Sequence, residues 1–142
     1  MKISARNLFT GKVTAIKKGA VNAEVELGLA GSDLITAGIT NGSVERLGLT
    51  VGAEVTALIK APLILVATGV DGMKFSTRNM LKGTVEQVEH GAVNCEVDLR
   101  LPGGNLLTAI ITERSAKDLT LRAGDTAWAL FKASSVILAV RA

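Results

Sequence analysis

A set of hydrogen-bond donors occurs twice in this chain, at a constant spacing of 72 residues. The repeated pairs are Ser4/Ser76, Arg6/Arg78, Thr40/Thr112 and Lys60/Lys132, with the amides Asn7/Asn79 and Asn22/Asn94. A tetrahedral oxyanion is bound by many donors that converge on four oxygens, together with modest positive charge. The donor set therefore suits a small oxyanion. The alternative is that the arginines and lysines are solvated cations and that the hydroxyl groups make local turn contacts.

These donors belong to an internal repeat that spans nearly the whole chain. Residues 4–70 align without a gap on residues 76–142, and 28 of the 67 aligned pairs are identical. Such self-similarity predicts two domains, 1–69 and 74–142, joined by a linker at about 68–75. The repeat also serves as a filter, because polar residues kept in both copies are candidates for a shared task.

Composition limits the classes of function that the chain can have. Hydrophobic residues make up 48% of it, which is more than two small barrels can bury internally, so we expect packing between halves or subunits. The net charge of +3, without a long Lys/Arg run, does not favour a duplex DNA-binding surface. The sequence shows neither a signal peptide nor an apolar run long enough to span a membrane, so we expect a cytoplasmic protein without a membrane partner.

The sequence does not point to catalysis. The single histidine, His90, aligns with Lys18 and is interpreted as a surface turn residue, since a catalytic histidine needs an oriented partner. The single cysteine, Cys95, aligns with Ala23 and is interpreted as a small apolar core residue. Two pairs of carboxylates on strand faces, Glu24/Glu26 and Glu96/Asp98, are interpreted as solvated or interface groups. With no P-loop and no zinc-type spacing, we expect no enzyme, no catalytic cofactor and no metal site.

Each half is predicted to be mainly β, with one short helix. Apolar and polar residues alternate as in strands, and Ser43 and Ser115 begin the predicted helices, Ser43 as the N-cap. The predicted strands cover 11–16, 23–27, 34–39, 55–60 and 63–66, and 83–88, 95–99, 106–111, 126–132 and 136–140. A helix between the third and fourth strands is the element order of an OB-like five-stranded barrel, so we predict two such barrels in tandem.

Five strings, present in order in both halves, resemble the molybdate-binding Mop domain. In the first half they are Ser4-Ala5-Arg6-Asn7, Gly19-Ala20-Val21-Asn22, the segment 39–44, Leu47-Gly48-Leu49 and Lys60-Ala61. With two such domains, the chain resembles a molbindin of the di-Mop type. The resemblance implies OB-like barrels that assemble six at a time, which for this chain means a homotrimer. It also implies that molybdate, and usually tungstate, binds at interfaces between domains.

The resemblance further implies two classes of site. The interface class maps to Ser4, Ala5, Arg6, Thr40, Lys60 and Ala61, and to Ser76, Thr77, Arg78, Thr112, Lys132, Ala133 and Ser134. A second class, on a threefold axis, maps to Ala20, Val21, Asn22, Ala92, Val93 and Asn94. Pro62 occupies the place of Ser134 in the first copy and offers neither a hydroxyl nor an N–H group. We therefore expect the interface sites to differ in affinity by about tenfold or more.

The favoured hypothesis is intracellular storage or homeostasis of molybdate. One alternative is a regulatory module that senses the oxyanion and acts through a partner protein. A second is an OB-type binder of single-stranded nucleic acid, which would stack bases on aromatic side chains. The aromatic residues Phe9, Phe75, Phe131 and Trp128 have no aromatic counterpart in the other copy, so we expect no nucleic-acid partner.

Overall fold

The computed structural model describes residues 1–142 and contains ten strands and two α-helices. The first half holds β1 (Asn7–Lys18), β2 (Asn22–Gly28), β3 (Leu34–Thr40), α1 (Asn41–Leu47), β4 (Glu54–Ile59) and β5 (Leu65–Ala67). The second half holds β6 (Asn79–His90), β7 (Asn94–Arg100), β8 (Leu106–Thr112), α2 (Glu113–Asp118), β9 (Thr126–Phe131) and β10 (Ile137–Ala139). Three single 3₁₀ turns complete the chain: η1 (Ala30–Ser32), η2 (Ala61–Leu63) and η3 (Ala133–Ser135). None of the helices has the length and apolar character needed to cross a membrane.

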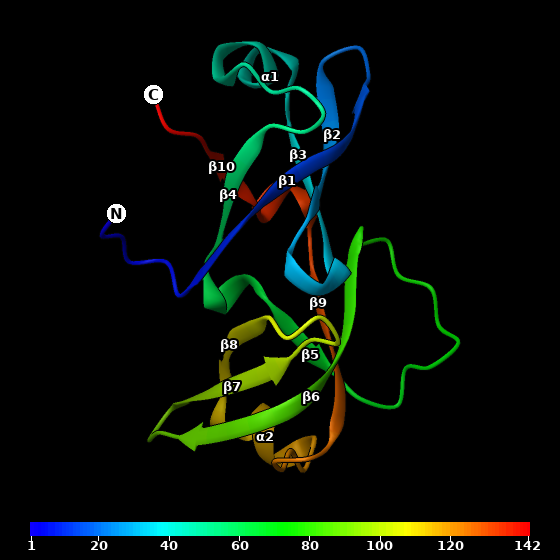
Figure 1. Ribbon diagram of the computed structural model, residues 1–142. Coiled ribbons are helices and arrows are strands. Elements are labelled where there is room, and N and C mark those ends of the chain that lie inside the picture. The colour runs from blue at the N-terminus through cyan, green and yellow to red at the C-terminus, as the bar shows by residue number, and fades with distance from the viewer.

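The strands form two five-stranded antiparallel sheets that exchange their last strands. The strand orders are β10-β4-β1-β2-β3 and β5-β9-β6-β7-β8, so each sheet takes one strand from the opposite half of the chain (Figure 1). The outer strands of each sheet also contact one another, β10 with β3 and β5 with β8, which closes each sheet into an OB-like barrel. The predicted all-β fold is confirmed. The ranges 1–69 and 74–142 delimit the sequence repeats, whereas each barrel is assembled from both.

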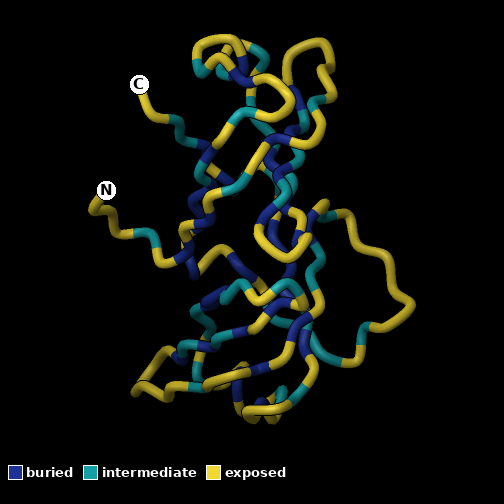
Figure 2. The backbone as a smooth tube through the Cα atoms, in the orientation of Figure 1, coloured by how far each residue is buried: buried dark blue, intermediate teal, exposed yellow.

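The core follows directly from the alternation in the sequence. Val25 and Leu27 are fully buried, while Glu24 and Glu26 lie on the other face of β2. The same pattern continues through both barrels, and one cluster of 27 buried apolar residues includes members from both halves. Burial is concentrated along the strands, whereas the hairpin tips and the segment between β5 and β6 are exposed (Figure 2). The halves therefore share a single core, as the high apolar content indicated.

The helices begin two residues before the serines that were predicted to start them, and their N-caps lie three residues before those serines. The hydroxyl of Thr40 accepts a hydrogen bond from the Ser43 backbone N–H at 3.0 Å, and Thr112 does the same for Ser115 at 3.1 Å. The prediction of Ser43 as the N-cap is therefore wrong. An N-cap must precede the first turn so that its oxygen can reach the N–H two or three residues later, and Thr40 holds that position.

Two buried asparagines join the halves through backbone groups. The Asn7 side chain donates to the Thr108 carbonyl at 2.8 Å and accepts from the Thr108 N–H at 2.8 Å, and it also donates to the Ile59 carbonyl at 3.2 Å. Asn79 makes the same two-way bond to Thr36, with both distances 2.8 Å. Each amide thus attaches the first strand of one half to the third strand of the other. Asn7 and Asn79 are structural residues, and the earlier grouping of them with the anion donors is wrong.

A second connection lies at the loops that precede β3 and β8. The Asp33 carboxylate accepts hydrogen bonds from the Gly103 N–H at 2.9 Å and from the Asn105 side chain at 2.8 Å. A Cβ atom on Gly31 would overlap the backbone of Gly103, and Gly31 has a φ of +72°, so glycine is required there on both counts. These contacts and the asparagine bonds fix the relative position of the barrels.

The asparagine bonds can be tested by substitution. We predict that Asn7→Ala lowers the free energy of unfolding by about 3 kcal/mol, because it leaves the buried N–H and carbonyl of Thr108 without partners. Asn79→Ala should destabilise less, since its amide makes two of these bonds rather than three. Urea denaturation at one fixed protein concentration measures both effects. The control is Thr10→Ala, which removes an exposed hydroxyl contact with Thr56 and should change stability by less than about 0.5 kcal/mol. Equal midpoints for Asn7→Ala and Thr10→Ala would contradict the assignment.

Candidate functional site

An open cavity of about 550 Å³ lies where the second half of the chain meets the first barrel. The first half contributes the β1–β2 hairpin and β3, and the second half contributes η3. The lining residues are Lys17, Lys18, Gly19, Asn22, Ala23, Glu24, Gly38, Ile39, Thr40, Ala133 and Ser134. We call this space the first cavity. It combines hydroxyl, amide and ammonium donors, which is the chemistry that a small oxyanion requires.

The cavity exists because η3 can lie directly against β3. Gly38 has no side chain, and a Cβ atom there would lie 3.5 Å from the Ala133 Cβ and 3.6 Å from the Ser134 nitrogen. The short turn after β9 is thereby held at van der Waals distance from β3, beside Thr40 at the end of that strand. One site is thus built from two halves of the same chain.

The hydroxyl of Thr40 already has a structural task. It accepts from the Ser43 N–H and donates to the Ser43 hydroxyl at 2.9 Å. Its proton must turn away from Ser43 before it can reach an anion in the cavity. Ser43 does not line the cavity itself, but its hydroxyl and backbone N–H hold the Thr40 side chain beside it.

The repeated arginines form ion pairs across the two halves. Arg78 donates to the Glu24 carboxylate at 2.8 Å, and Arg6 donates two hydrogen bonds to Glu96 at 2.6 and 3.0 Å. The hydrogen bond and the negative charge of Glu96 raise the pKa of Arg6 above its ordinary value. Because Glu24 lines the first cavity, the Arg78 guanidinium lies at its margin. Of the four carboxylates interpreted as solvated or interface groups, Glu24 and Glu96 thus make contacts between the halves.

The structure brings only part of the predicted interface set into the first cavity. Thr40, Ala133 and Ser134 line it, as does Asn22 from the second predicted class. Lys60 and Lys132 are exposed and directly precede η2 and η3, and Ala61 is buried. The residues that do not line it are Ser4, Ala5, Arg6, Lys60, Ala61, Ser76, Thr77, Arg78, Thr112 and Lys132.

The Thr77 hydroxyl oxygen is buried and has no hydrogen-bond partner within the chain. The residues predicted for a threefold axis lie at the tips of the β1–β2 and β6–β7 hairpins, where Val21 and Val93 are 69% and 72% exposed. These tips are therefore accessible in a single chain.

The corresponding place in the second barrel has a different character. It is a cavity of about 290 Å³ lined by Glu89, His90, Gly91, Asn94, Glu96 and Ile110, and we call it the second cavity. The repeat replaces Lys17 by Glu89, Lys18 by His90, Gly38 by Ile110 and Ser134 by Pro62. The second cavity is thus smaller and has lost two ammonium groups. An anion should favour the first cavity on both steric and electrostatic grounds.

Sequence reasoning missed Lys17, Lys18 and Gly38 for an identifiable reason. The filter kept only residues shared by both copies, and these three differ between the copies. The signal was available in the differences, since the two lysines and the glycine lie beside the repeated Gly19 and Ile39. When the two copies of a site differ, a comparison that keeps only shared residues does not select the residues that are specific to one copy.

Comparison with known proteins places both repeats in one family. The model of the TOBE domain matches residues 3–66 and 76–138. The chain is 43% identical over 141 residues to the molybdenum transport protein ModE of Herbaspirillum seropedicae. It is 46% identical over 140 residues to the molybdenum-pterin-binding protein MopA of Rhodobacter capsulatus. Each alignment covers 99% of this chain but 52% and 53% of those proteins, so the chain spans about half their length.

The chain is also similar to a solved structure over its full length. That structure is the cytoplasmic molybdate-binding protein ModG with molybdate bound, with a TM-score of 0.94 and 49% sequence identity. The match covers 99% of this chain and 100% of that chain. The similarity therefore extends over both barrels of this chain, including the exchanged strands.

The role of Gly38 in the first cavity can be tested with two substitutions. Gly38→Ile introduces the residue that the second copy carries and should fill the space beside η3, lowering molybdate affinity by about tenfold or more. Gly38→Ala is the size control, because its Cβ would make ordinary contacts at 3.5 Å and should bind nearly as the unmodified chain does. Titration calorimetry compares the three proteins. Full affinity in Gly38→Ile would show that the anion binds elsewhere.

Proposed function

This chain belongs to the TOBE-domain family, and from that premise we propose that it binds molybdate, and tungstate as well, for storage or homeostasis in the cytoplasm. One observation carries the proposal. Thr40 and Ser134, from opposite halves, meet in a cavity that also holds Lys17 and Lys18. Hydroxyl donors and cations converge there on a space open to solvent. The molybdate-bound relative of equal length and the named molybdenum-binding relatives support the choice of anion.

We propose passive, reversible binding without a chemical reaction. The ionisable groups that line the first cavity are Lys17, Lys18 and Glu24, and Glu24 is paired with Arg78. None of these forms the hydrogen-bonded pair of nucleophile and oriented base that acyl or phosphoryl transfer needs. The cavity therefore supplies charge and hydrogen bonds to an anion. It requires no catalytic cofactor for that task.

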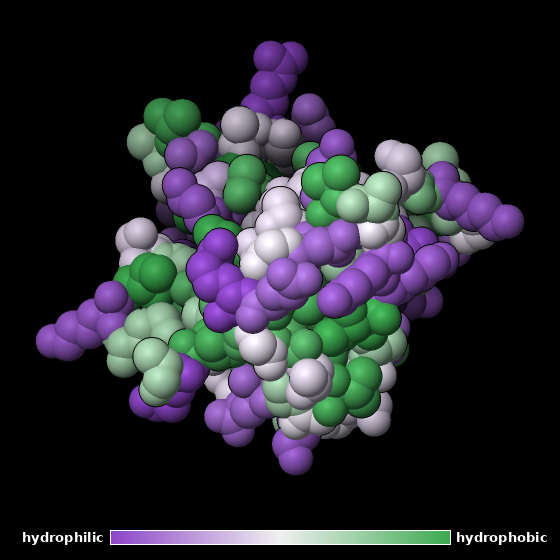
Figure 3. Space-filling model, turned by 90° about the horizontal axis from the view of Figure 1, so that it is seen from above, coloured by the Kyte–Doolittle hydropathy of each residue, from purple (hydrophilic) through white to green (hydrophobic).

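We also propose that the chain assembles into a homotrimer. Each sheet carries a row of apolar cross-strand neighbours, Leu8–Leu58–Ile137 on one and Met80–Leu130–Leu65 on the other, and the middle leucine of each row is buried. Ile137 and Leu65 are 62% and 65% exposed in the single chain. Apolar side chains also lie beside a band of hydrophilic ones on the surface seen from above (Figure 3). A neighbouring subunit would cover such surface and close the open cavities.

The aromatic residues support a binding role that does not involve nucleic acid. Phe9 and Phe131 are buried in the core, and the Trp128 ring nitrogen donates to the Asp71 carboxylate at 3.1 Å. Single-stranded nucleic acid is bound by aromatic faces that are free to stack on bases. Phe9 and Phe131, two of the four aromatic side chains, are thus not accessible for stacking on bases.

The difference between Pro62 and Ser134 should be visible in a binding isotherm. We predict at least two affinity classes for molybdate, and we predict that Pro62→Ser strengthens the weaker class by about tenfold by restoring a hydroxyl and an N–H donor. Titration calorimetry with molybdate measures the classes, and sulfate serves as the control anion. A single class that Pro62→Ser leaves unchanged would contradict unequal sites, and no molybdate binding at all would overturn the proposed function.

The assembly can be tested through the apolar rows. Ile137→Glu places a charge on the exposed row, so we predict that the molar mass in solution falls from three chains to one. Sedimentation equilibrium provides the measurement. Val51→Glu is the matched control, because Val51 is 66% exposed but lies in a turn outside either row. A trimer in both variants, or a monomer before any substitution, would refute the proposed interface.

A further inference from the structure

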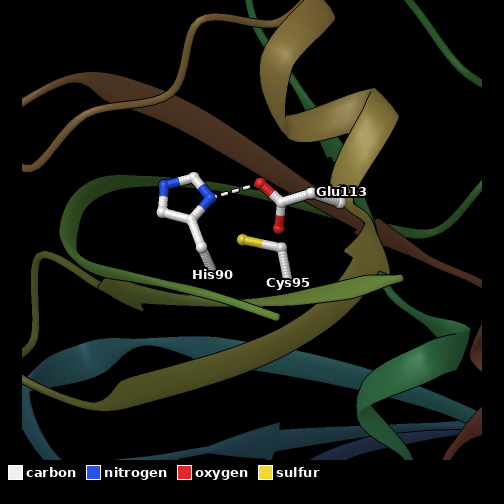
Figure 4. A group of neighbouring side chains, drawn as sticks. All are labelled: His90, Cys95 and Glu113. Carbon is white, nitrogen blue, oxygen red and sulfur yellow. Dashed lines mark hydrogen bonds and ion pairs between the residues drawn. The ribbon is translucent and has the colours of Figure 1, made fainter. Parts of the chain in front are cut away.

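Three potential metal ligands meet where β6, β7 and α2 come together in the second barrel (Figure 4). A ring nitrogen of His90, the Cys95 Sγ and a carboxylate oxygen of Glu113 all lie within 4.8 Å of one another. His90 and Cys95 are direct cross-strand partners, so their side chains lie on the same face of the hairpin. The Glu113 backbone N–H donates to the Val93 carbonyl at 2.8 Å, which fixes the start of α2 above that hairpin. The backbone therefore holds all three positions.

The cluster contains a polar atom that the protein itself does not satisfy. One Glu113 carboxylate oxygen contacts His90 Nδ1, while the other is buried and has no hydrogen-bond partner. Cys95 is 1% exposed, and its sulfur makes only a long contact of 3.7 Å with the Glu96 carbonyl. Buried carboxylate oxygens without a partner are rare and need an explanation such as an ion. The orphaned oxygen is therefore evidence independent of the residue types.

We propose that His90, Cys95 and Glu113 bind one zinc ion per chain. A thiolate, an imidazole and a carboxylate are the three ligand types that zinc takes in proteins. Three protein ligands leave a fourth tetrahedral position for water, as in open zinc sites. Bonds of about 2.0–2.3 Å place the ligands of one zinc ion less than about 4 Å apart. The observed spacing reaches that range with small side-chain rotations, because the His90 side chain is exposed.

The site belongs to the second barrel alone. The first barrel carries Lys18, Ala23 and Asn41 at the three corresponding positions, and the Asn41 side chain donates to the Gly19 carbonyl at 2.9 Å. None of these is a thiolate, an imidazole or a carboxylate. His90 also lines the second cavity, whose repeat counterpart carries two lysines. A dication at this point would restore positive charge to the barrel that lost it.

The sequence predicted no metal site because it contains no short metal-ligand motif. The ligands lie at positions 90, 95 and 113, and only the hairpin register and the start of α2 bring them together. Burial first, and then the negative charges of Glu113 and Glu96, raise the pKa of the Cys95 thiol. A bound dication would displace that proton and offset the same negative charges.

The test uses the 142-residue chain, freed of metal with a chelator and kept without molybdate. Cobalt(II) is the spectroscopic probe, and we expect one cobalt per chain with the charge-transfer absorption of a thiolate–cobalt bond, which zinc then displaces. Cys95→Ala, which introduces the residue of the first barrel, should abolish this band and weaken zinc binding by more than about tenfold. His90→Lys, at an exposed position, should weaken zinc binding similarly.

The matched control is Glu89→Gln, which removes a neighbouring exposed charge without touching the three ligands and should bind metal as the unmodified chain does. Absence of the thiolate–cobalt band, or equal zinc affinity in the unmodified chain and in Cys95→Ala, would overturn the proposal. Because no oxyanion is present, the outcome does not depend on whether molybdate binds. Circular dichroism of each variant shows that the fold is retained.

Discussion

The rest of the structure depends on two asparagine side chains that pair with peptide groups across the halves. Asn7 binds both backbone groups of Thr108, and Asn79 binds both of Thr36. Each bond attaches the first strand of one half to the third strand of the other, in the interior where water does not compete. Because β5 and β10 are also exchanged between the sheets, the barrels cannot separate without breaking both the asparagine hydrogen bonds and the pairing of these strands. The first cavity follows from this arrangement, because β3 and η3 come from opposite halves.

The repeat gives the chain two corresponding cavities, and the sequence differences between the copies make these cavities unequal. Lys17, Lys18 and Gly38 leave the first cavity open and positively charged, whereas Glu89, His90 and Ile110 make the second smaller and less positive. The position that holds Lys18 in the first copy holds His90 in the second, beside a buried cysteine and a partly unsatisfied carboxylate. Loss of one binding chemistry and gain of another can therefore arise from the same few positions.

The sequence predicted what is local and could not predict what depends on the opposite half. Strands such as β2 were found because Val25 and Leu27 alternate with carboxylates, which is a property of one segment. The exchange of β5 and β10 was not predictable, because Leu65 and Ile137 occupy equivalent places in the repeat and either strand fits either sheet. For the site, Thr40 and Ser134 were predicted through the family resemblance, and of the two only Thr40 is repeated in the other copy. Lys17 and Lys18 were missed because only residues that are identical in both copies of the repeat were selected.

The measurement that tests the account most directly is an anomalous-scattering map at the molybdenum absorption edge, from crystals grown with molybdate. A site built across the two halves predicts a peak between Thr40 of β3 and Ser134 of η3, within one chain and beside Lys17 and Lys18. A map with peaks only at the exposed hairpin tips around Val21 and Val93, or with no peak, would contradict a binding site built across the two halves.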